Sequence, residues 1–463
     1  MNKILTFPKV ASSENPWDPK NIATFVEVNK SLWDEEKDNR PADEAVWALS
    51  LIKYGHVRNY HDALWGWTGT AFRPVEADLR RFLILLFGQT LTGQASSRFV
   101  NRVVEAIKMA AESAPDETPP WPEQRGIAFS NGWLNLDTLE LERHDPSHGN
   151  RHVFPVEWRI DGIPEDAKAL VDDFLNSTFA DDPAKIPVIL AFIGYALSPD
   201  MVWETCLFLL GNGRNGKGTL LSMVAAVFGD AAVEMDLEEL ATDRFARAEL
   251  ADRRLMISSD LGEANLRGQT GIFKRLTAFE TVPNAQRKYG QIFRFKNEAK
   301  LIMAANSLPR SNDRARGYYE RFLPILFTQY FDPMSPDAVP DLKKRLITPN
   351  ALSYLVFRAV TAYVTVYPSL PHLPQDSREA LAAYVERDDI VAAALGTEGC
   401  FERDNPGQGI PTNEAYSTFR EWATQQGYAK VPTQRKFTER LRQLDVTYRR
   451  TNKERRLGLR LRT

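Results

Sequence analysis

Cysteine and long apolar runs are scarce in this sequence. Its 463 residues include two cysteines, Cys206 and Cys400, which are too few for a disulfide framework or a cysteine-based zinc site. No segment reaches the roughly 18 apolar residues of a membrane span, and no long apolar run follows Lys3 as it would in an export signal. We therefore expect a soluble protein in a reducing, cytoplasmic setting, with no membrane partner.

The sequence also lacks a large net charge of either sign. The formal net charge is −3, and 43% hydrophobic and 26% charged residues are typical of a globular protein, so the total charge does not indicate a nucleic-acid partner. The distribution of charge does, because the segment from residue 434 to the end is strongly basic. Its basic residues are Arg435, Lys436, Arg440, Arg442, Arg449, Arg450, Lys453, Arg455, Arg456, Arg460 and Arg462, against Glu439, Asp445 and Glu454. This asymmetry predicts a local basic surface.

The most informative segment joins an apolar run to a glycine-rich turn and then to an apolar helix. The turn and the start of the helix are Gly211, Asn212, Gly213, Arg214, Asn215, Gly216, Lys217, Gly218 and Thr219. Glycines let backbone N–H groups surround a polyphosphate, the helix N-terminus adds positive potential, and Lys217 can reach the β- and γ-phosphates. We therefore predict a phosphate-binding loop for ATP. Because Gly218 stands where a Mg²⁺-binding hydroxyl residue usually follows the lysine, Thr219 is the predicted metal ligand.

Two further strands are predicted to end beside this loop. One apolar run ends in Asp260, with Glu263 shortly after it, and another, 300–305, ends at Asn306. A phosphate loop requires an acidic residue on a neighbouring strand to hold Mg²⁺ and to polarise the attacking water. We predict Asp260 at the metal, Glu263 at the water and Asn306 at the γ-phosphate. The alternatives are solvated loop carboxylates and a turn-forming asparagine.

The chain divides into five predicted parts. They are an extension of unknown role at 1–44, an amino-terminal mixed α/β and helical region at 45–200, an ATPase core at 201–331, a helical connector at 332–373 and a carboxyl-terminal domain at 374–463. Short apolar runs that alternate with helical segments predict a parallel sheet covered by helices in the core. Asn131-Gly132 predicts a hairpin turn between two short strands.

The last domain is predicted to contain two helices and a basic hairpin. Apolar residues recur at helical spacing around Phe419 and again around Phe437, with Thr433 as a suitable N-cap of the second helix. Residues 446–450 and 456–461 then alternate at strand period. Such an order suggests a winged helix, in which DNA is contacted by Arg435, Lys436, Arg440, Arg449 and Arg450. The alternative is a charged face exposed to solvent.

The order of these motifs resembles that of the superfamily 3 helicases. The sequence has Gly-x-Gly-x-Asn-Gly-Lys at 211–217, a strand ending in Asp260, a helix with Lys274, a strand ending in Asn306, and Arg321 before an apolar strand. The chain is most similar to the phage and plasmid type, which is related to the poxvirus primase-helicases. The segments 131–136 and 194–197 resemble the amino-terminal region of that family.

The resemblance implies a role for each matching residue. Lys217 would be the phosphate lysine, Asp260 and Glu263 the second acidic motif, and Asn306 the sensor. Arg321 would be a finger that reaches the nucleotide of a neighbouring subunit. Many relatives have a paired arginine where Glu320-Arg321 stands here, so Arg314 and Arg316 remain alternatives for the finger.

The family moves single-stranded DNA with a hairpin that projects into the pore of a hexameric ring. In this chain the segment between Thr281 and Phe295 fits the hairpin, with Arg287 and Lys288 beside a Tyr289-Gly290 tip. Both basic residues, together with Lys274, are expected to contact DNA. An ordinary solvated hairpin is the alternative.

The expected fold is therefore an α/β, AAA+-like P-loop ATPase core with an amino-terminal region and a winged helix. The expected function is an ATP-dependent DNA helicase of a phage or mobile element, acting in replication in a bacterial host cell. Its expected cofactors are ATP and Mg²⁺, and its expected partners are single-stranded and duplex DNA, further copies of the chain, and a separate primase or polymerase. An ATP-switched initiator or loader without unwinding activity, and a P-loop phosphotransferase, are the competing functions.

Overall fold

The computed structural model describes most of the chain. The described residues are 14–29, 33–34, 40–41, 44–60, 63–90, 97–111, 121–259, 270–309, 315–332, 334–335, 339–396, 399–404, 409–426, 431–450 and 455–462. Asp260, Glu263 and Arg314 lie outside these ranges. None of the described helices is long and apolar enough to cross a membrane.

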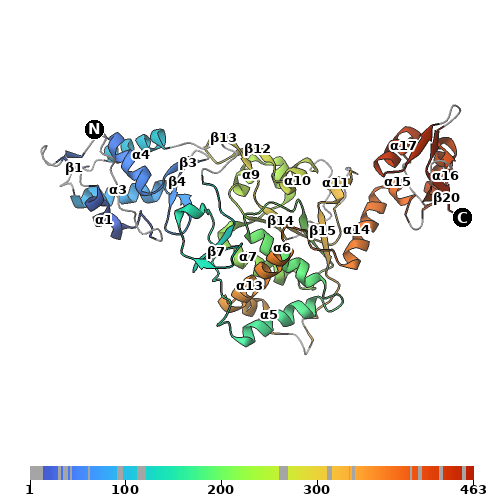
Figure 1. Ribbon diagram of the computed structural model, residues 1–463, viewed down its shortest axis with the longest axis horizontal. Helices are drawn as coiled ribbons and strands as arrows, with labels where there is room; N and C mark the ends of the chain where they lie inside the picture. Colours follow the sequence, from blue (N-terminus) through green and yellow to red (C-terminus); the bar gives the residue numbers. More distant parts are fainter. Residues whose placement is uncertain are drawn as a thin grey trace.

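A five-stranded parallel sheet forms the centre of the molecule, in the order β10-β11-β14-β9-β15 (Figure 1). Its strands are β9 (Cys206–Leu210), β10 (Ala232–Glu234), β11 (Leu255–Ser258), β14 (Lys300–Ala305) and β15 (Phe322–Leu326). All neighbouring pairs are parallel, so the carboxyl ends of the strands meet at one edge. Parallel sheets are covered on both faces, and the long apolar runs of these strands follow from that double burial. The predicted parallel sheet is confirmed.

Helices cover both faces of this sheet. Because side chains alternate along a strand, Leu207 and Leu209 of β9 face one apolar cluster while Phe208 faces the other. The first cluster is built with α5 (Glu165–Thr178), α6 (Lys185–Leu197), α7 (Lys217–Phe228), α12 (Leu342–Leu346) and α13 (Pro349–Val366). The second is built with α8 (Leu237–Thr242), α9 (Arg244–Leu250), α10 (Thr270–Thr277), α11 (Arg316–Tyr319) and α14 (Gln375–Asp388). A hairpin of β12 (Thr281–Gln286) and β13 (Ile292–Lys296) packs on this second cluster.

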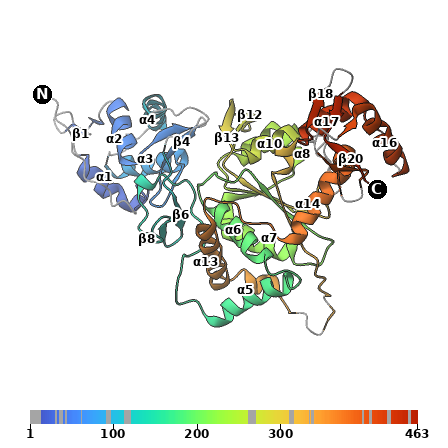
Figure 2. The ribbon, with the colours of Figure 1, turned by 45° about the vertical axis from the view of Figure 1, so that its right-hand side comes forward.

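The amino-terminal part has a core of its own and lies to one side of the sheet in both views (Figures 1 and 2). Trp17 and Phe25, from the extension of unknown role, are buried in that core. Its helices are α1 (Ile22–Val28), α2 (Glu44–Tyr54), α3 (Glu76–Thr90) and α4 (Ser97–Ala110). Its strands are β1 (Trp33–Asp34), β2 (Arg40–Pro41), β3 (Arg58–Tyr60), β4 (Ala63–Trp67) and β5 (Phe72–Pro74).

A small antiparallel sheet follows, made of β6 (Gly126–Phe129), β7 (Gly132–Asn135) and β8 (Leu141–Glu142). The predicted hairpin is present, but its turn is one residue earlier than Asn131-Gly132. Phe129 pairs with Gly132, which leaves Ser130 and Asn131 as the turn. Gly132 belongs to the strand, where a side chain would approach the Glu142 carbonyl oxygen to 2.6 Å.

The carboxyl-terminal domain lies on the opposite side of the sheet from the amino-terminal part (Figure 2). It contains α15 (Ile390–Ala393), α16 (Thr412–Gln425) and α17 (Gln434–Gln443), with strands β16 (Phe401–Arg403), β17 (Ile410–Pro411), β18 (Tyr448–Arg450), β19 (Arg455–Leu457) and β20 (Leu459–Leu461). Helix α14, which the prediction assigned to this domain, packs on the sheet instead. Its Tyr384 is buried in the second cluster and donates to the Pro309 carbonyl oxygen at 2.5 Å.

Candidate nucleotide and nucleic-acid sites

The glycine-rich turn joins β9 to α7 at the carboxyl edge of the sheet. The Gly211 N–H donates to the Ala305 carbonyl oxygen at 3.1 Å, which ties the start of the turn to the end of β14. Gly211 has φ +153°, and a side chain there would come within 2.4 Å of the Phe327 carbonyl oxygen. Gly216 caps α7 in the left-handed conformation, at φ 92°. Both positions therefore require glycine because of backbone conformation and close approach.

Lys217, the first residue of α7, folds back over the turn. Its Nζ donates to the Gly211 carbonyl oxygen and, at 3.3 Å, to Asn215 Oδ1. Asn215 is buried, and its Nδ2 donates to the Phe327 carbonyl oxygen at 3.3 Å. Asn215 thus fixes the shape of the turn, while the ammonium group of Lys217 lies over its backbone. A bound phosphate would compete with the carbonyl oxygen for that ammonium group.

A cavity of about 750 Å³ opens in front of the turn. It is lined by residues 213–219, which include Thr219, and by Ala304 of β14. Among the residues that the structure describes, none lies within 4 Å of the place where a Gly218 side chain would project. A volume of this order is ordinary for a small-molecule site. The geometry leaves room at Gly218 and puts the hydroxyl residue Thr219 on the cavity wall.

Several residues that line this cavity were not predicted from the sequence, among them Glu234, Ser259 and Lys343. Glu234 ends β10, Ser259 directly follows β11, and Lys343 lies on the short helix α12. Ser259 could have been predicted from the sequence, since it directly precedes Asp260 at the end of a predicted strand. No sequence pattern indicates Glu234 or Lys343, because only the packing of β10 and α12 brings them to the turn.

Asn306 lies at the carboxyl ends of the parallel strands, and Arg321 lies at their amino ends. Asn306 is exposed and directly follows Ala305, whose carbonyl oxygen accepts from Gly211. Arg321 precedes β15, and its carbonyl oxygen accepts from the N–H of Cys206 at the start of β9. Five residues of β9 separate Cys206 from the turn, about 16 Å at about 3.3 Å per residue. Arg321 is therefore distant from the phosphate loop of its own chain.

The side chain of Arg321 is held within the chain. Its Nη1 donates to Thr277 Oγ1 at 2.9 Å and lies 3.3 Å from Glu204 Oε2. Arg316, one of the two alternatives for the finger, is much more exposed and forms an ion pair with Glu320 at 2.8 Å. Arg321 thus lies at the amino ends of the strands, away from its own phosphate loop.

The predicted hairpin is present as β12 and β13, with residues 287–291 at its tip. Tyr289 is 96% exposed, and Lys288 lies over its ring at 5.6 Å. Arg287 instead turns toward the core, where its Nη2 lies 3.5 Å from Asp252 Oδ2. Lys274 lies half-buried on α10. The tip therefore exposes Lys288 and Tyr289, whereas Arg287 is engaged within the chain.

The two helices and the hairpin expected in the last domain are present as α16, α17 and β18–β19. Thr433 occupies the N-cap position of α17 but makes no side-chain hydrogen bond there. Arg435, Lys436 and Arg449 are exposed, and the Arg450 side chain lies outside the described part. A winged helix stays a prediction.

The helical spacing of α17 predicts Arg440 on the outward side, as its expected DNA contact requires, and this prediction was wrong. Arg440 is only 8% exposed, and its Nε donates to Asp389, which is fully buried. Its Nη1 donates to Gln443 Oε1 at 2.9 Å. The helical spacing put Arg440 among polar neighbours, but α15 and α17 pack so that this side of α17 meets the carboxylate. The guanidinium group is therefore used within the domain.

Comparison with known proteins gives two family models that match parts of this chain. Residues 53–180 match a family described as "D5 N terminal like", and residues 209–318 match a family of unknown function, DUF5906. The first match covers the amino-terminal region up to the end of α5. The second runs from the end of β9, through the phosphate loop, to α11.

A protein of Acanthamoeba polyphaga mimivirus, described as a helicase by inference, is 24% identical over 325 residues. The match covers 60% of this chain but only 33% of that protein, so the chain spans about a third of the length of this curated relative.

Among solved structures, two apo structures of the NrS-1 C-terminal region are similar at 14% and 13% identity, each with a TM-score of 0.48. They cover 76% and 90% of this chain and 78% and 100% of theirs. A likeness at this level does not specify a shared fold. The family models and the mimivirus relative, by contrast, agree with the order of motifs along this sequence. The resemblance of the chain to the superfamily 3 helicases of the phage and plasmid primase-helicase type is thereby confirmed.

Proposed function

We propose that this chain is an ATP-dependent DNA helicase of a phage or mobile element, which forms a ring and translocates on single-stranded DNA. The observation that carries the proposal is the strand–turn–helix unit from β9 to α7. Its glycines have the backbone geometry of a phosphate loop, and Lys217 lies over a cavity large enough for a nucleotide. The name of the mimivirus relative and the strand order β10-β11-β14-β9-β15 support an AAA+-like helicase core.

Four residues predicted for the nucleotide site have the following roles in this proposal. Lys217 binds the β- and γ-phosphates of ATP, and Thr219 holds Mg²⁺ together with Asp260, which lies outside the described residues. Asn306 orients water at the γ-phosphate. Its exposed position beside the turn supports this role.

The position of Arg321 supports nucleotide sites that are shared between subunits. Arg321 lies at the amino edge of the sheet, and its own phosphate loop lies at the carboxyl edge. An arginine there can stabilise transition-state charge only on the nucleotide of a neighbouring copy. A closed ring, with six subunits as in the family, gives every Arg321 such a neighbour.

The test measures ATP turnover by the full chain with and without single-stranded DNA. We expect DNA to stimulate turnover. We also expect Lys217→Ala to lower it by on the order of 10²-fold or more, as the loss of one preorganised charge-stabilising donor does elsewhere. Lys344→Ala is the matched control, because Lys344 is exposed and forms an ion pair with Asp341, the N-cap residue of the same helix. Normal turnover in a folded Lys217→Ala chain would contradict the phosphate-loop assignment.

Strand displacement on a forked duplex and native mass spectrometry separate the competing functions. Displacement by a hexamer supports the helicase. Nucleotide-dependent binding of duplex DNA without displacement would identify an initiator or loader instead. ATP turnover that is indifferent to DNA would favour a phosphotransferase that acts on a small molecule.

A further inference from the structure

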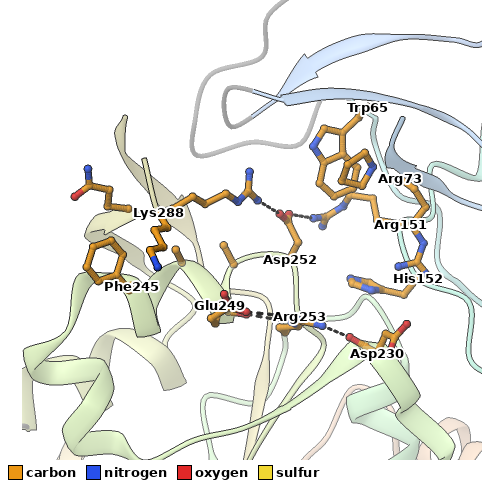
Figure 3. Close-up of a pocket in the computed structure, with 15 residues that line it drawn as sticks. Trp65, Arg73, Arg151, His152, Asp230, Phe245, Glu249, Asp252, Arg253 and Lys288 are labelled. Atoms are coloured by element: carbon orange, nitrogen blue, oxygen red, sulfur yellow. Dashed lines mark hydrogen bonds and ion pairs between the residues drawn. The ribbon is translucent and has the colours of Figure 1, made fainter. Parts of the chain in front are cut away.

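A second cavity, of about 730 Å³, lies between the amino-terminal part and the core. Figure 3 shows its two walls. Trp65, Arg73, Arg151 and His152 come from the amino-terminal side, while Phe245 and Lys288 come from α9 and the tip of the hairpin. Five basic and three acidic side chains line it. The cavity is separate from the phosphate loop, whose residues do not line it.

Most of these charges are already neutralised within the chain. Arg151 forms ion pairs with Asp252, at 2.9 Å, and with Glu298. Asp252 also pairs with Arg287, and Arg253 lies 3.8 Å from Glu249. Burial would raise the pKa of Glu298, but Arg151 and Arg254 hold it below its ordinary value. The two Arg151 pairs tie the segment that follows β8 to the core, whereas the other two pairs lie within the core.

Two cations in the lining remain without a carboxylate partner. The side chain of Arg73 makes no hydrogen bond or ion pair with any residue that the structure describes, although Asp230 is near enough to affect its pKa. Within the described ranges, the ammonium group of Lys288 lies over the ring of Tyr289 and forms no ion pair. A half-buried guanidinium group that lacks a partner is costly unless an anion binds it. The cavity therefore carries positive charge that the fold itself does not use.

The wall beside Arg73 also has unused hydrogen-bonding groups. Trp65 Nε1, Arg151 Nε and His152 Nε2 are buried and have no hydrogen-bond partner among the described residues. His152 is 6% exposed. Burial and the surrounding arginines hold its pKa well below the ordinary value, so the imidazole is neutral at pH 7 and retains one N–H donor. Clustered unsatisfied groups in a folded protein require an explanation, and a bound ligand is one.

An exposed aromatic ring completes the lining on the opposite wall. Phe245 lies on α9, is 42% exposed and faces the cavity near Lys288 (Figure 3). Tyr289 is the next residue along the hairpin tip. Cations that bind phosphates, alternating with rings that stack on bases, are the means by which proteins hold single-stranded nucleic acid.

We propose that this cavity binds a short segment of single-stranded DNA, with Arg73 and Lys288 at its phosphates and Phe245 against a base. The inference rests on the proposed translocation along single-stranded DNA. Lys288 belongs to the hairpin already expected to contact DNA, whereas Arg73 and Phe245 are contacts that neither the phosphate loop nor the motifs of the sequence assign. The strand would pass from the hairpin tip into the space between the two parts of the molecule.

The test measures the affinity of the full chain for fluorescein-labelled oligo-dT across a salt series. Arg73→Gln should weaken binding and reduce the log–log salt slope by about 0.7, the value for one phosphate of a single strand. Phe245→Ala should weaken binding by at least about fivefold through the loss of stacking. Arg81→Gln is the control, because Arg81 is an exposed arginine on α3 outside the cavity. The exposure of Phe245 makes its substitution safe for folding, which thermal unfolding checks.

A second probe, labelled ATP, distinguishes a DNA strand from a free nucleotide. It is offered to Lys217→Ala, in which the phosphate loop is disabled. Residual ATP binding that Arg73→Gln removes would assign the cavity to a free nucleotide and overturn the inference. Wild-type affinity for oligo-dT in both Arg73→Gln and Phe245→Ala would also overturn it. Failure of the wild-type chain to bind oligo-dT at all would instead contradict the proposed function.

Discussion

The carboxyl-terminal domain and the cavity between the amino-terminal part and the core are both basic, but they use their cations differently. In the domain, Arg440 is buried against Asp389, and Arg460 and Arg462 both pair with Glu402. In the cavity, Arg73 has no such partner among the described residues. The carboxyl-terminal domain, which stands out as basic in the sequence, thus uses part of its positive charge in its own ion pairs. The cavity, which no sequence pattern indicated, keeps an arginine without a described partner.

This difference shows that a count of basic residues does not measure nucleic-acid binding. A cation within hydrogen-bonding distance of a carboxylate has its charge neutralised and its geometry fixed. A cation that lines a cavity without a partner gains most from an incoming phosphate. Four variants, one of them a double substitution, test how far this distinction holds.

The largest effect, on ATP turnover, is expected at Arg321. This residue tests the distinction because it is paired within its own chain and yet is expected to act on a ligand. Although Arg321 is held by Glu204 and Thr277 within its own chain, Arg321→Ala should lower ATP turnover about 10³-fold if the residue is an arginine finger. Nucleotide binding should persist. Mixing Arg321→Ala with Lys217→Ala should restore part of the turnover, because each variant damages a different half of a shared site. Verified mixed rings without rescue would move the finger to Arg316 or Arg314.

A large effect on stability is expected at Arg440. Arg440→Ala leaves Asp389 buried without its partner, and breaking a buried pair costs about 3–5 kcal/mol. Arg435→Ala, on the same helix but exposed, should change the free energy of unfolding by no more than about 0.5 kcal/mol. Denaturant unfolding of the two variants measures both values. Equal stability of Arg440→Ala and the wild type would mean that this pair does not hold the domain together.

Lys300 is a buried cation of a third kind, which lines neither of the two cavities described above. Its Nζ donates to the Ser198 carbonyl oxygen at 2.9 Å, and burial, reinforced by Arg254, lowers its pKa from 10.5 to about 7. Between these two pH values the unfolded chain binds more protons, so stability rises with pH. The cost of the buried charge is complete below pH 7 and is lost as the pH approaches 10.5.

Lys300→Met should remove that pH-dependent cost. We expect the variant to exceed the wild type in free energy of unfolding by on the order of a few kcal/mol at pH 6, and the difference to shrink by pH 10. Urea unfolding at the two pH values measures it, and protonation of other groups cancels in the comparison. A difference that does not depend on pH would show that Lys300 keeps its ordinary pKa.

The smallest effect concerns the exposed residues of α17. Arg435→Gln combined with Lys436→Gln should lower the log–log salt slope for duplex DNA by about 0.9 for each phosphate contact that is lost. Salt titrations of duplex binding measure the slope, and Arg460→Gln serves as a control because Arg460 pairs with Glu402 at 2.5 Å. If the double substitution leaves the salt slope unchanged, Arg435 and Lys436 make no contact with duplex DNA and form only a solvated surface. The contrast with the cavity would then be sharper.

The sequence by itself determined the features that depend on neighbouring residues. Apolar runs such as 207–210 and 300–305 predicted the buried parallel strands, and glycines 211 and 216 predicted the turn that joins β9 to α7. The hairpin with Tyr289-Gly290 at its tip was predicted instead from the resemblance to the superfamily 3 helicases. Backbone preferences and the burial of alternating side chains act over a few residues, so they can be recognised from the sequence. Binding of ATP and DNA by these features stays a prediction.

Only the tertiary structure decided which charges meet. Arg440 lies on α17, and Asp389, 51 residues earlier, caps α15, so the helical pattern of α17 alone placed Arg440 outside. The second cavity likewise gathers Arg73, Phe245 and Lys288 from three distant segments. Ion pairing depends on distances of a few ångströms between groups that only packing brings together. For that reason the sequence could predict where phosphate-binding motifs lie, but not which of its cations remain available to a ligand.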